Sequence, residues 1–378
     1  MKSKIFCIIL MTLTFITIFV DKCYAQSVDV SAKAAVLIEA KTGKIIYEKN
    51  SYQKLPMAST TKIMTTLLCL ESGNLDEEFV VDPEAIKVEG SSMGLQEGDI
   101  VTKRALCIGM LLPSGNDAAN VTAVLIGGSV DKFADMMNER AAQIGMTRTC
   151  FVTPSGLEAE GHGASAYDMS LLAREALRNE DFAAICSQSS MKLSFGNPPY
   201  DRWLKNTNKL LTMYNGVNGV KTGFTDEAGR CLVSSCEKNG ISLICVTLNA
   251  PSDWSDHSKL YDYGYSKLKA VEVKPENHCV DVVGGIGQSL PLSSADTISI
   301  GTDDGDLSKL EERAYIENFL YAPVEKGTYA GYVDYYFEGK FVDSIELFTD
   351  AGTEVYKSSK KQETSIVEKI KDFFEKIF

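Results

Sequence analysis

Three short motifs with nucleophilic and basic side chains follow one another along the chain. They are Ser59-Thr60-Thr61-Lys62, Ser114-Gly115-Asn116 and Lys221-Thr222-Gly223. The first begins an apolar stretch with helical spacing, so Ser59 and Lys62 are expected one turn apart on one helix face. The helix N-terminus and burial both disfavour a charged amine, which lowers the pKa of such a lysine. This pair therefore has the chemistry of a serine nucleophile with a lysine as general base.

Each motif is common on its own, so its surroundings matter. The Ser-Gly-Asn pattern recurs at 72–74, and the Lys-Thr-Gly pattern recurs at 41–43. Ser51 also begins a Ser-x-x-Lys pattern, but Pro56 follows it and would break a helix there. Further patterns of this kind begin at Ser129, Ser189, Ser235, Ser266 and Ser358. Among these serines, Ser59 begins a predicted apolar helix and is also followed along the chain by the other two motifs.

The second and third motifs each allow a structural and a chemical interpretation. Ser114-Gly115-Asn116 interrupts an apolar helical stretch, so a turn there would present a hydroxyl and an amide to a cleft. A simple loop between two helices explains it equally well. Lys221 and Thr222 follow a strand residue and suit an anionic substrate, while Gly223 lets another backbone approach closely. The alternative is a hairpin turn, which is how we interpret 41–43.

Hydrophobic periodicity predicts the elements that position these motifs. Strands are predicted at 34–38, 45–47, 219–220, 231–234 and 241–248. Helices are predicted at 59–71, at 103–126 with a break at 113–115, at 130–144, at 166–178 and at 261–269. Because strands stand at both ends of 26–270, we expect one sheet that joins the first hairpin to the last strands and is packed by helices. This is an α/β layered domain.

The remaining C-terminal sequence predicts a different architecture. Residues 271–357 hold short alternating runs separated by Gly, Asp and Ser, which predicts a small all-β domain. A polar linker is predicted at 358–364. Residues 365–378 carry bulky apolar side chains on one helical face and charges on the other, which favours an amphipathic helix lying on a membrane surface. Packing of this helix on the β-domain is the alternative.

The first 25 residues predict export. Lys2 and Lys4 precede an almost wholly apolar run that ends before Cys23-Tyr24-Ala25. This is the pattern of a secretory signal peptide cleaved after Ala25. An uncleaved membrane anchor is the alternative, although the run is short for a spanning helix.

Charge and cysteine content restrict the partners. The chain carries a formal net charge of −13, and loss of the first 25 residues makes it about −15. Phosphate backbones repel such a protein, so we expect no nucleic-acid partner. Eight cysteines follow the signal peptide, and an even number in an exported chain suggests disulfides. The alternative is buried apolar thiols, because Cys69, Cys107 and Cys245 lie in apolar runs. No cysteine or histidine spacing predicts a structural metal site.

Four segments carry a resemblance to a known family. They are 54–66 (KLPMASTTKIMTT), 112–119 (LPSGNDAA), 153–172 (TPSGLEAEGHGASAYDMSLL) and 216–233 (GVNGVKTGFTDEAGRCLV). Together they resemble the low-molecular-mass penicillin-binding proteins that are serine D-alanyl-D-alanine carboxypeptidases. The likeness spans residues 30–268 and continues in kind through a β-domain and a C-terminal anchor. It implies a β-lactamase/transpeptidase-like domain, with an antiparallel sheet packed by helices.

The resemblance implies a role for each motif. Ser59 attacks the terminal D-Ala–D-Ala bond of a peptidoglycan stem peptide, and Lys62 is the general base. Ser114 and Asn116 relay protons and hold substrate or water. Further expected roles are substrate binding by Lys221, Thr222 and Gly223, and an oxyanion hole formed by the backbone N–H groups of Ser59 and Phe224.

The same resemblance implies the partners and the location. The enzyme needs no cofactor and no metal, is acylated by β-lactams, and acts at the outer face of the cytoplasmic membrane with 365–378 as a peripheral anchor.

Two positions depart from the family pattern. Phe224 stands where some relatives carry His, which a backbone donor tolerates. Relatives can also place an Arg after the last strand pair to bind the substrate carboxylate, but residues 249–260 contain none. The carboxylate would then be held by Lys221 and Thr222 alone.

Two other functions are alternatives. A class A β-lactamase needs a deacylating Glu followed four residues later by Asn, but Glu158 is followed by His162 and Glu160 by Ala164. A non-catalytic peptidoglycan-binding scaffold would be expected to lack Ser59, Lys62 or Lys221.

Overall fold

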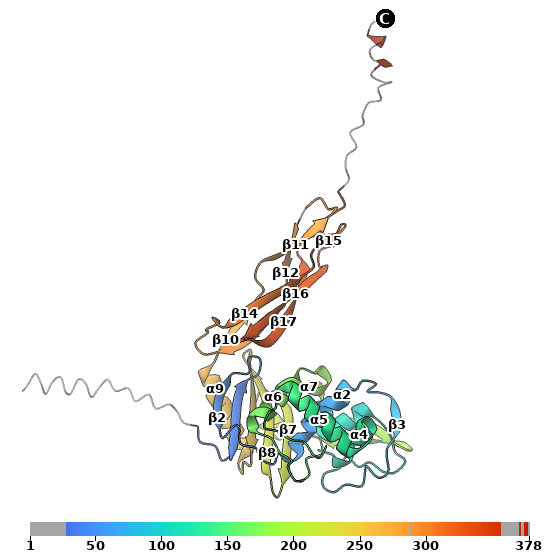
Figure 1. Ribbon diagram of the computed structural model, residues 1–378, viewed down its shortest axis with the longest axis vertical. Coiled ribbons are helices and arrows are strands. Elements are labelled where there is room, and N and C mark those ends of the chain that lie inside the picture. The colour runs from blue at the N-terminus through green and yellow to red at the C-terminus, as the bar shows by residue number, and fades with distance from the viewer. Residues whose placement is uncertain (1–27, 288, 357–369, 372–373, 377–378) are drawn as a thin grey trace, which may run out of the picture. The chain divides into compact units, whose positions relative to one another are not determined.

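The computed structural model describes residues 28–287, 289–356, 370–371 and 374–376 (Figure 1). The predicted signal peptide and linker lie outside these residues, as does most of the predicted C-terminal helix. The chain divides into two compact units. One contains 28–37, 47–234 and 245–264, and the other contains 38–46, 235–244 and 265 onward. The domain boundaries proposed from the sequence stay a prediction.

One five-stranded sheet joins strands from both ends of residues 26–270. Its strand order is β2-β1-β9-β8-β7. The strands are β1 (Ala34–Glu39), β2 (Ile45–Lys49), β7 (Val217–Thr225), β8 (Gly229–Lys238) and β9 (Ile241–Leu248). The first hairpin therefore pairs with the last strands, which confirms the predicted sheet. All six residues of β1 are buried, as its apolar run requires.

Helix α2 (Lys62–Glu71) is the centre of the helical layer. It follows the 3₁₀ turn η1 (Ala58–Thr61) and contacts α3, α4, α5, α6 and α7. These helices gather beside the sheet in Figure 1. Their bounds are α3 (Lys103–Leu111), α4 (Asn116–Gly127), α5 (Val130–Ile144), α6 (Ala166–Leu177) and α7 (Glu180–Cys186). The predicted break at 113–115 is the turn between α3 and α4. Because α2 is surrounded, eight of its residues are buried, including the lysine with which it begins.

Several elements of this unit differ from the prediction or were not predicted. The closing helix is α9 (Asp253–Lys267), which begins eight residues before the predicted start at 261. The polar residues of its first turns hide the helical period, although Asp253 and Asp256 suit a helix N-terminus. The unpredicted elements are α7, β3 (Glu78–Val80), β4 (Ile100–Thr102), β5 (Ser190–Gly196), β6 (Pro199–Lys205) and α8 (Leu210–Met213).

The second unit contains the predicted all-β region. Six strands pair in the order β14-β16-β17-β12-β11-β15, and β10 pairs with β13. Their bounds are β10 (Lys269–Val273), β11 (His278–Val283), β12 (Ser289–Ser293), β13 (Ile298–Thr302), β14 (Leu310–Ile316), β15 (Leu320–Tyr321), β16 (Tyr329–Phe337) and β17 (Lys340–Thr349). Alternate residues of β16 and β17 fill one apolar core. The alternating pattern therefore predicted this region correctly.

The described residues also show the state of the cysteines and the character of the helices. Within the described ranges all eight cysteines are free thiols, and Cys69, Cys107 and Cys245 are buried as the apolar runs indicated. The described residues therefore contain no disulfide, contrary to the disulfide interpretation. Across those same ranges, none of the helices combines the length and apolar character needed to cross a bilayer.

Candidate active site

The serine and lysine of the first motif meet where η1 becomes α2. Ser59 lies in η1 and is partly exposed, while Lys62 begins α2 and is fully buried. Lys62 Nζ is 2.9 Å from Ser59 Oγ. The two side chains therefore share one side of the helix start, as their spacing predicted.

The surroundings of Lys62 favour its neutral form. Its Nζ donates to Asn116 Oδ1 and to the Ser155 carbonyl oxygen, each at 2.7 Å. Burial lowers the pKa of Lys62 well below its ordinary value, and the nearby charge of Lys221 lowers it further, while Asp117 opposes the shift. A neutral amine has two N–H bonds, which these acceptors take, and its lone pair is left for the Ser59 hydroxyl.

The second motif forms the tight turn between α3 and α4. Ser114 has φ of 68°, a left-handed conformation that a non-glycine residue adopts at a cost. A Cβ on Gly115 would lie 2.9 Å from Met93 N, so glycine is needed for this close approach. Asn116 begins α4, and its amide donates to the Glu89 carbonyl at 2.7 Å. The turn therefore directs the Oδ1 atom of Asn116 toward Lys62, while the amide nitrogen of the same side chain is held by the Glu89 carbonyl.

The third motif lies on the edge strand β7. Lys221 is buried, and burial lowers its pKa to about 7. The Thr222 and Thr207 hydroxyl oxygens are 2.6 Å apart. A Cβ on Gly223 would lie 3.1 Å from Ser59 N and 2.9 Å from Met57 O. Glycine thus lets β7 lie directly against the turn that carries Ser59.

A cavity of about 480 Å³ joins the three motifs. Predicted site residues that line it are Ser59, Ser114, Thr222, Gly223 and Phe224. The other three, Lys62, Asn116 and Lys221, are buried next to these lining residues. The sequence analysis did not single out the remaining lining residues, which are Ser91, Asn206, Thr207, Lys209, Arg230, Asp253 and Trp254. They belong to no fixed motif, so only the fold reveals them.

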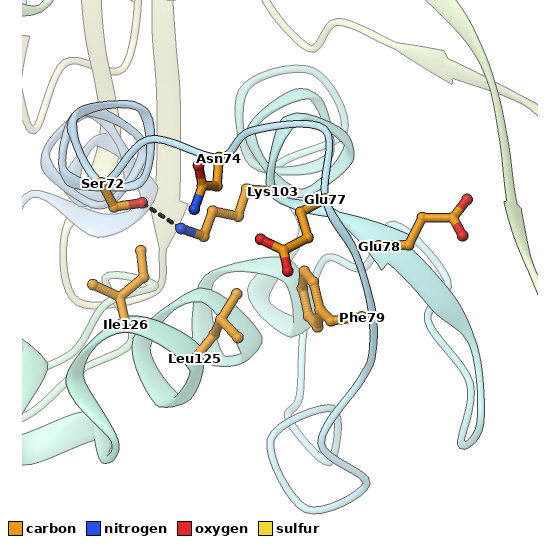
Figure 2. Close-up of a pocket in the computed structure, with 8 residues that line it drawn as sticks. All are labelled: Ser72, Asn74, Glu77, Glu78, Phe79, Lys103, Leu125 and Ile126. Atoms are coloured by element: carbon orange, nitrogen blue, oxygen red, sulfur yellow. Dashed lines mark hydrogen bonds between the residues drawn. The ribbon is translucent and has the colours of Figure 1, made fainter.

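A second cavity, of about 390 Å³, is lined by Ser72 and Asn74, which belong to the repeat of the second motif at 72–74. Lys103 Nζ donates a hydrogen bond of 2.9 Å to Ser72 Oγ there. Figure 2 shows this contact. Lys103 also donates to the Gly73 carbonyl, and Ser72 donates to the Cys69 carbonyl. These bonds satisfy backbone acceptors at the C-terminal end of α2. Ser72 is exposed and Lys103 partly so, hence this Ser–Lys contact lacks the burial that distinguishes Lys62.

Comparison with known proteins places the chain in a family. The family model of the D-alanyl-D-alanine carboxypeptidases matches residues 21–252, which is more than half of the chain. The chain belongs to the D-alanyl-D-alanine carboxypeptidase family. As such it is a serine peptidase that removes the terminal D-Ala of peptidoglycan stem pentapeptides through an acyl-enzyme, and it is acylated by β-lactams.

Individual relatives of this carboxypeptidase cover most of its length. The D-alanyl-D-alanine carboxypeptidase DacF of Bacillus subtilis is 35% identical over 79% of this chain and 80% of the relative. The D-alanyl-D-alanine carboxypeptidase DacC of Escherichia coli is 31% identical over 88% of this chain and 86% of the relative. The crystal structure of penicillin binding protein 5 from Haemophilus influenzae superposes with a TM-score of 0.63 at 27% identity, covering 87% of this chain and 99% of that one. The β-lactamase and scaffold alternatives are thereby set aside.

Proposed function

We propose that Ser59 is the acylated nucleophile of this carboxypeptidase and that Lys62 is its general base. The observation that carries the assignment is the 2.9 Å contact between Lys62 Nζ and Ser59 Oγ, made by a buried lysine whose pKa is lowered. A neutral Lys62 accepts the Ser59 proton while Oγ attacks the carbonyl carbon of the penultimate D-Ala. The carbon–nitrogen bond then breaks, and the proton returns to the departing D-Ala amine.

The second motif supports proton transfer in both half-reactions. Ser114 lines the cavity together with Ser59, so its hydroxyl can carry the proton from Lys62 to the leaving amine. Asn116 holds Lys62 through its Oδ1. In deacylation the same groups act on water, which attacks the Ser59 ester and restores the free hydroxyl.

The third motif supports substrate binding and the oxyanion hole. Thr222 faces the cavity, and Lys221 lies buried behind it. The close approach at Gly223 brings the backbone of β7 to the N–H of Ser59. We assign the oxyanion hole to the backbone N–H groups of Ser59 and Phe224, where each donor contributes about 10²–10³ in rate.

The decisive experiment compares wild type with Ser59→Ala. Release of D-Ala from diacetyl-Lys-D-Ala-D-Ala should be measurable for wild type and lost in the variant. Mass spectrometry should place a single penicillin adduct on Ser59. An adduct on another serine, or undiminished release by Ser59→Ala, contradicts the assignment.

We further propose that the enzyme is exported and attached to the outer face of the cytoplasmic membrane. The sequence patterns at 1–25 and 365–378 support this proposal. The secreted protein should begin at Gln26, which N-terminal mass spectrometry checks. Removal of 365–378 should abolish binding to anionic lipid vesicles without changing D-Ala release, whereas retained binding would favour packing of this segment on the β-domain.

A further inference from the structure

The substrate of a carboxypeptidase ends in a free carboxylate, which needs a positive group in the cavity. The two lysines of the motifs serve this purpose poorly, because both are fully buried and neither lines the cavity. The helix that follows the last strand pair supplies no arginine. Of the described residues that line the cavity, Lys209 and Arg230 are cationic.

Arg230 is held rigidly at the start of β8. Its Nε and Nη2 donate to the two carboxylate oxygens of Asp253, each at 2.9 Å. Its guanidinium carbon lies 5.2 Å from the ring centroid of Trp254. Asp253 is 2% exposed and begins α9. The strand and the helix together therefore fix the plane of the guanidinium.

The remaining edge of this guanidinium is available to a ligand. The Arg230 side chain is 40% exposed, and no hydrogen bond within the described ranges uses its Nη1. Arg230 lines the same cavity as Ser59 and Thr222. Lys209 lines it too, but its side chain is exposed and no part of the described chain orients its amine. Only one of the two cations is therefore preorganised.

We propose that Arg230 binds the terminal carboxylate of the substrate, that Asp253 is the positioning residue for it, and that Thr222 completes the clamp. The proposal rests on the assignment of Ser59 as nucleophile. A guanidinium stays charged at all working pH values and offers a planar pair of donors to a carboxylate. The arginine missing from 249–260 is supplied instead by the neighbouring strand β8.

A substrate that lacks the carboxylate separates this role from a structural one. The two peptides are diacetyl-Lys-D-Ala-D-Ala and its C-terminal amide. Arg230→Gln should lower kcat/KM on the acid by about 10- to 100-fold, the size expected for a lost hydrogen bond between charged groups. On the amide the same change should have less than about a threefold effect, because no carboxylate is present to lose its partner.

Two further variants make the test specific. Lys209→Gln removes the other cavity cation and should leave kcat/KM on both peptides within about twofold of wild type. Asp253→Asn should raise KM for the acid more than it lowers kcat, because it loosens the guanidinium without touching the reacting atoms.

The outcomes that overturn the proposal are an equal loss on acid and amide, or a loss for Lys209→Gln as large as that for Arg230→Gln. Stoichiometric labelling of Ser59 at high penicillin concentration shows that each variant is folded. If Arg230→Gln is not labelled, Arg230→Lys is used, which should retain part of the activity on the acid. Absence of D-Ala release in wild type would instead count against the proposed function.

Discussion

The positive charge of Lys221 lowers the pKa of Lys62, and both lysines are fully buried beside the same cavity. The proposed general base and the lysine of the third motif are thereby coupled, since each proton taken up by one disfavours a proton on the other. Lys62 can therefore act as a neutral base at a pH where an ordinary lysine is charged. Asp117 opposes this effect from α4.

The coupling predicts a shift in the pH profile of acylation. Activity should fall as pH decreases through the lowered pKa of Lys62, because a protonated Lys62 cannot accept the Ser59 proton. Lys221→Met removes a positive neighbour and should raise the pKa of Lys62, so this acidic limb should move to higher pH. The measurement is the penicillin acylation rate of Ser59 against pH, normalised to each variant's maximum. An unchanged limb in Lys221→Met, or an equal shift in the exposed-lysine control Lys205→Met, would contradict the coupling.

The same substitution should stabilise the fold. The pKa of Lys221 is about 7 in the folded chain against an ordinary 10.5, so between these values the unfolded chain binds the proton more tightly. The free energy of unfolding of wild type should therefore increase as pH rises from about 7 to 10.5. Lys221→Met should increase the free energy of unfolding by as much as a few kcal/mol at pH 7. The increase should become smaller as pH approaches 10.5. Urea unfolding of both proteins at pH 7 and at pH 10.5 tests this prediction. A stability difference between variant and wild type that stays constant or grows as pH rises would refute it.

Gly223 should be intolerant of a side chain. In Gly223→Ala the new Cβ would press on Met57 O and on Ser59 N, so β7 must move away from η1. Since this displaces the assigned oxyanion donors, acylation should slow by about 10²-fold or more. The matched control is Gly287→Ala, where the nearest atom is Ser289 O at 3.9 Å. Similar acylation rates for the two variants would show that the close approach at Gly223 does not serve the reaction.

The second Ser–Lys contact should be catalytically silent. Ser72→Ala and Lys103→Ala remove the bond shown in Figure 2 at the end of α2. Both variants should keep D-Ala release within about twofold of wild type and lose at most about 1 kcal/mol of stability, as expected for a partly exposed cap. D-Ala release and thermal unfolding measured on the same preparations check both statements. A penicillin adduct on Ser72 would contradict the assignment of Ser59 as the nucleophile.

Much of the fold follows from local pattern. The hairpin at β1 and β2, the helices α2, α5 and α6, and the alternating strands of the β-region each show their period in the sequence. The predicted start of α9 is too late in the sequence, because the first turns of this helix are polar. Asp253 in these turns binds Arg230 on β8, and Asp256 binds the backbone of the N-terminal segment at Ala32. Their partners are distant in sequence, so no local pattern reveals them.

The sequence by itself determined which residues could react, because the order and setting of the three motifs distinguish Ser59 from every other Ser-x-x-Lys serine. Only the tertiary structure decided what surrounds them. Burial of Lys62 among Asn116, Ser155 and Lys221 sets its protonation state, and pairing of β8 with α9 turns Arg230 into an oriented cation. Desolvation and preorganised geometry depend on atoms brought together from remote parts of the chain, which residue types and spacing do not specify.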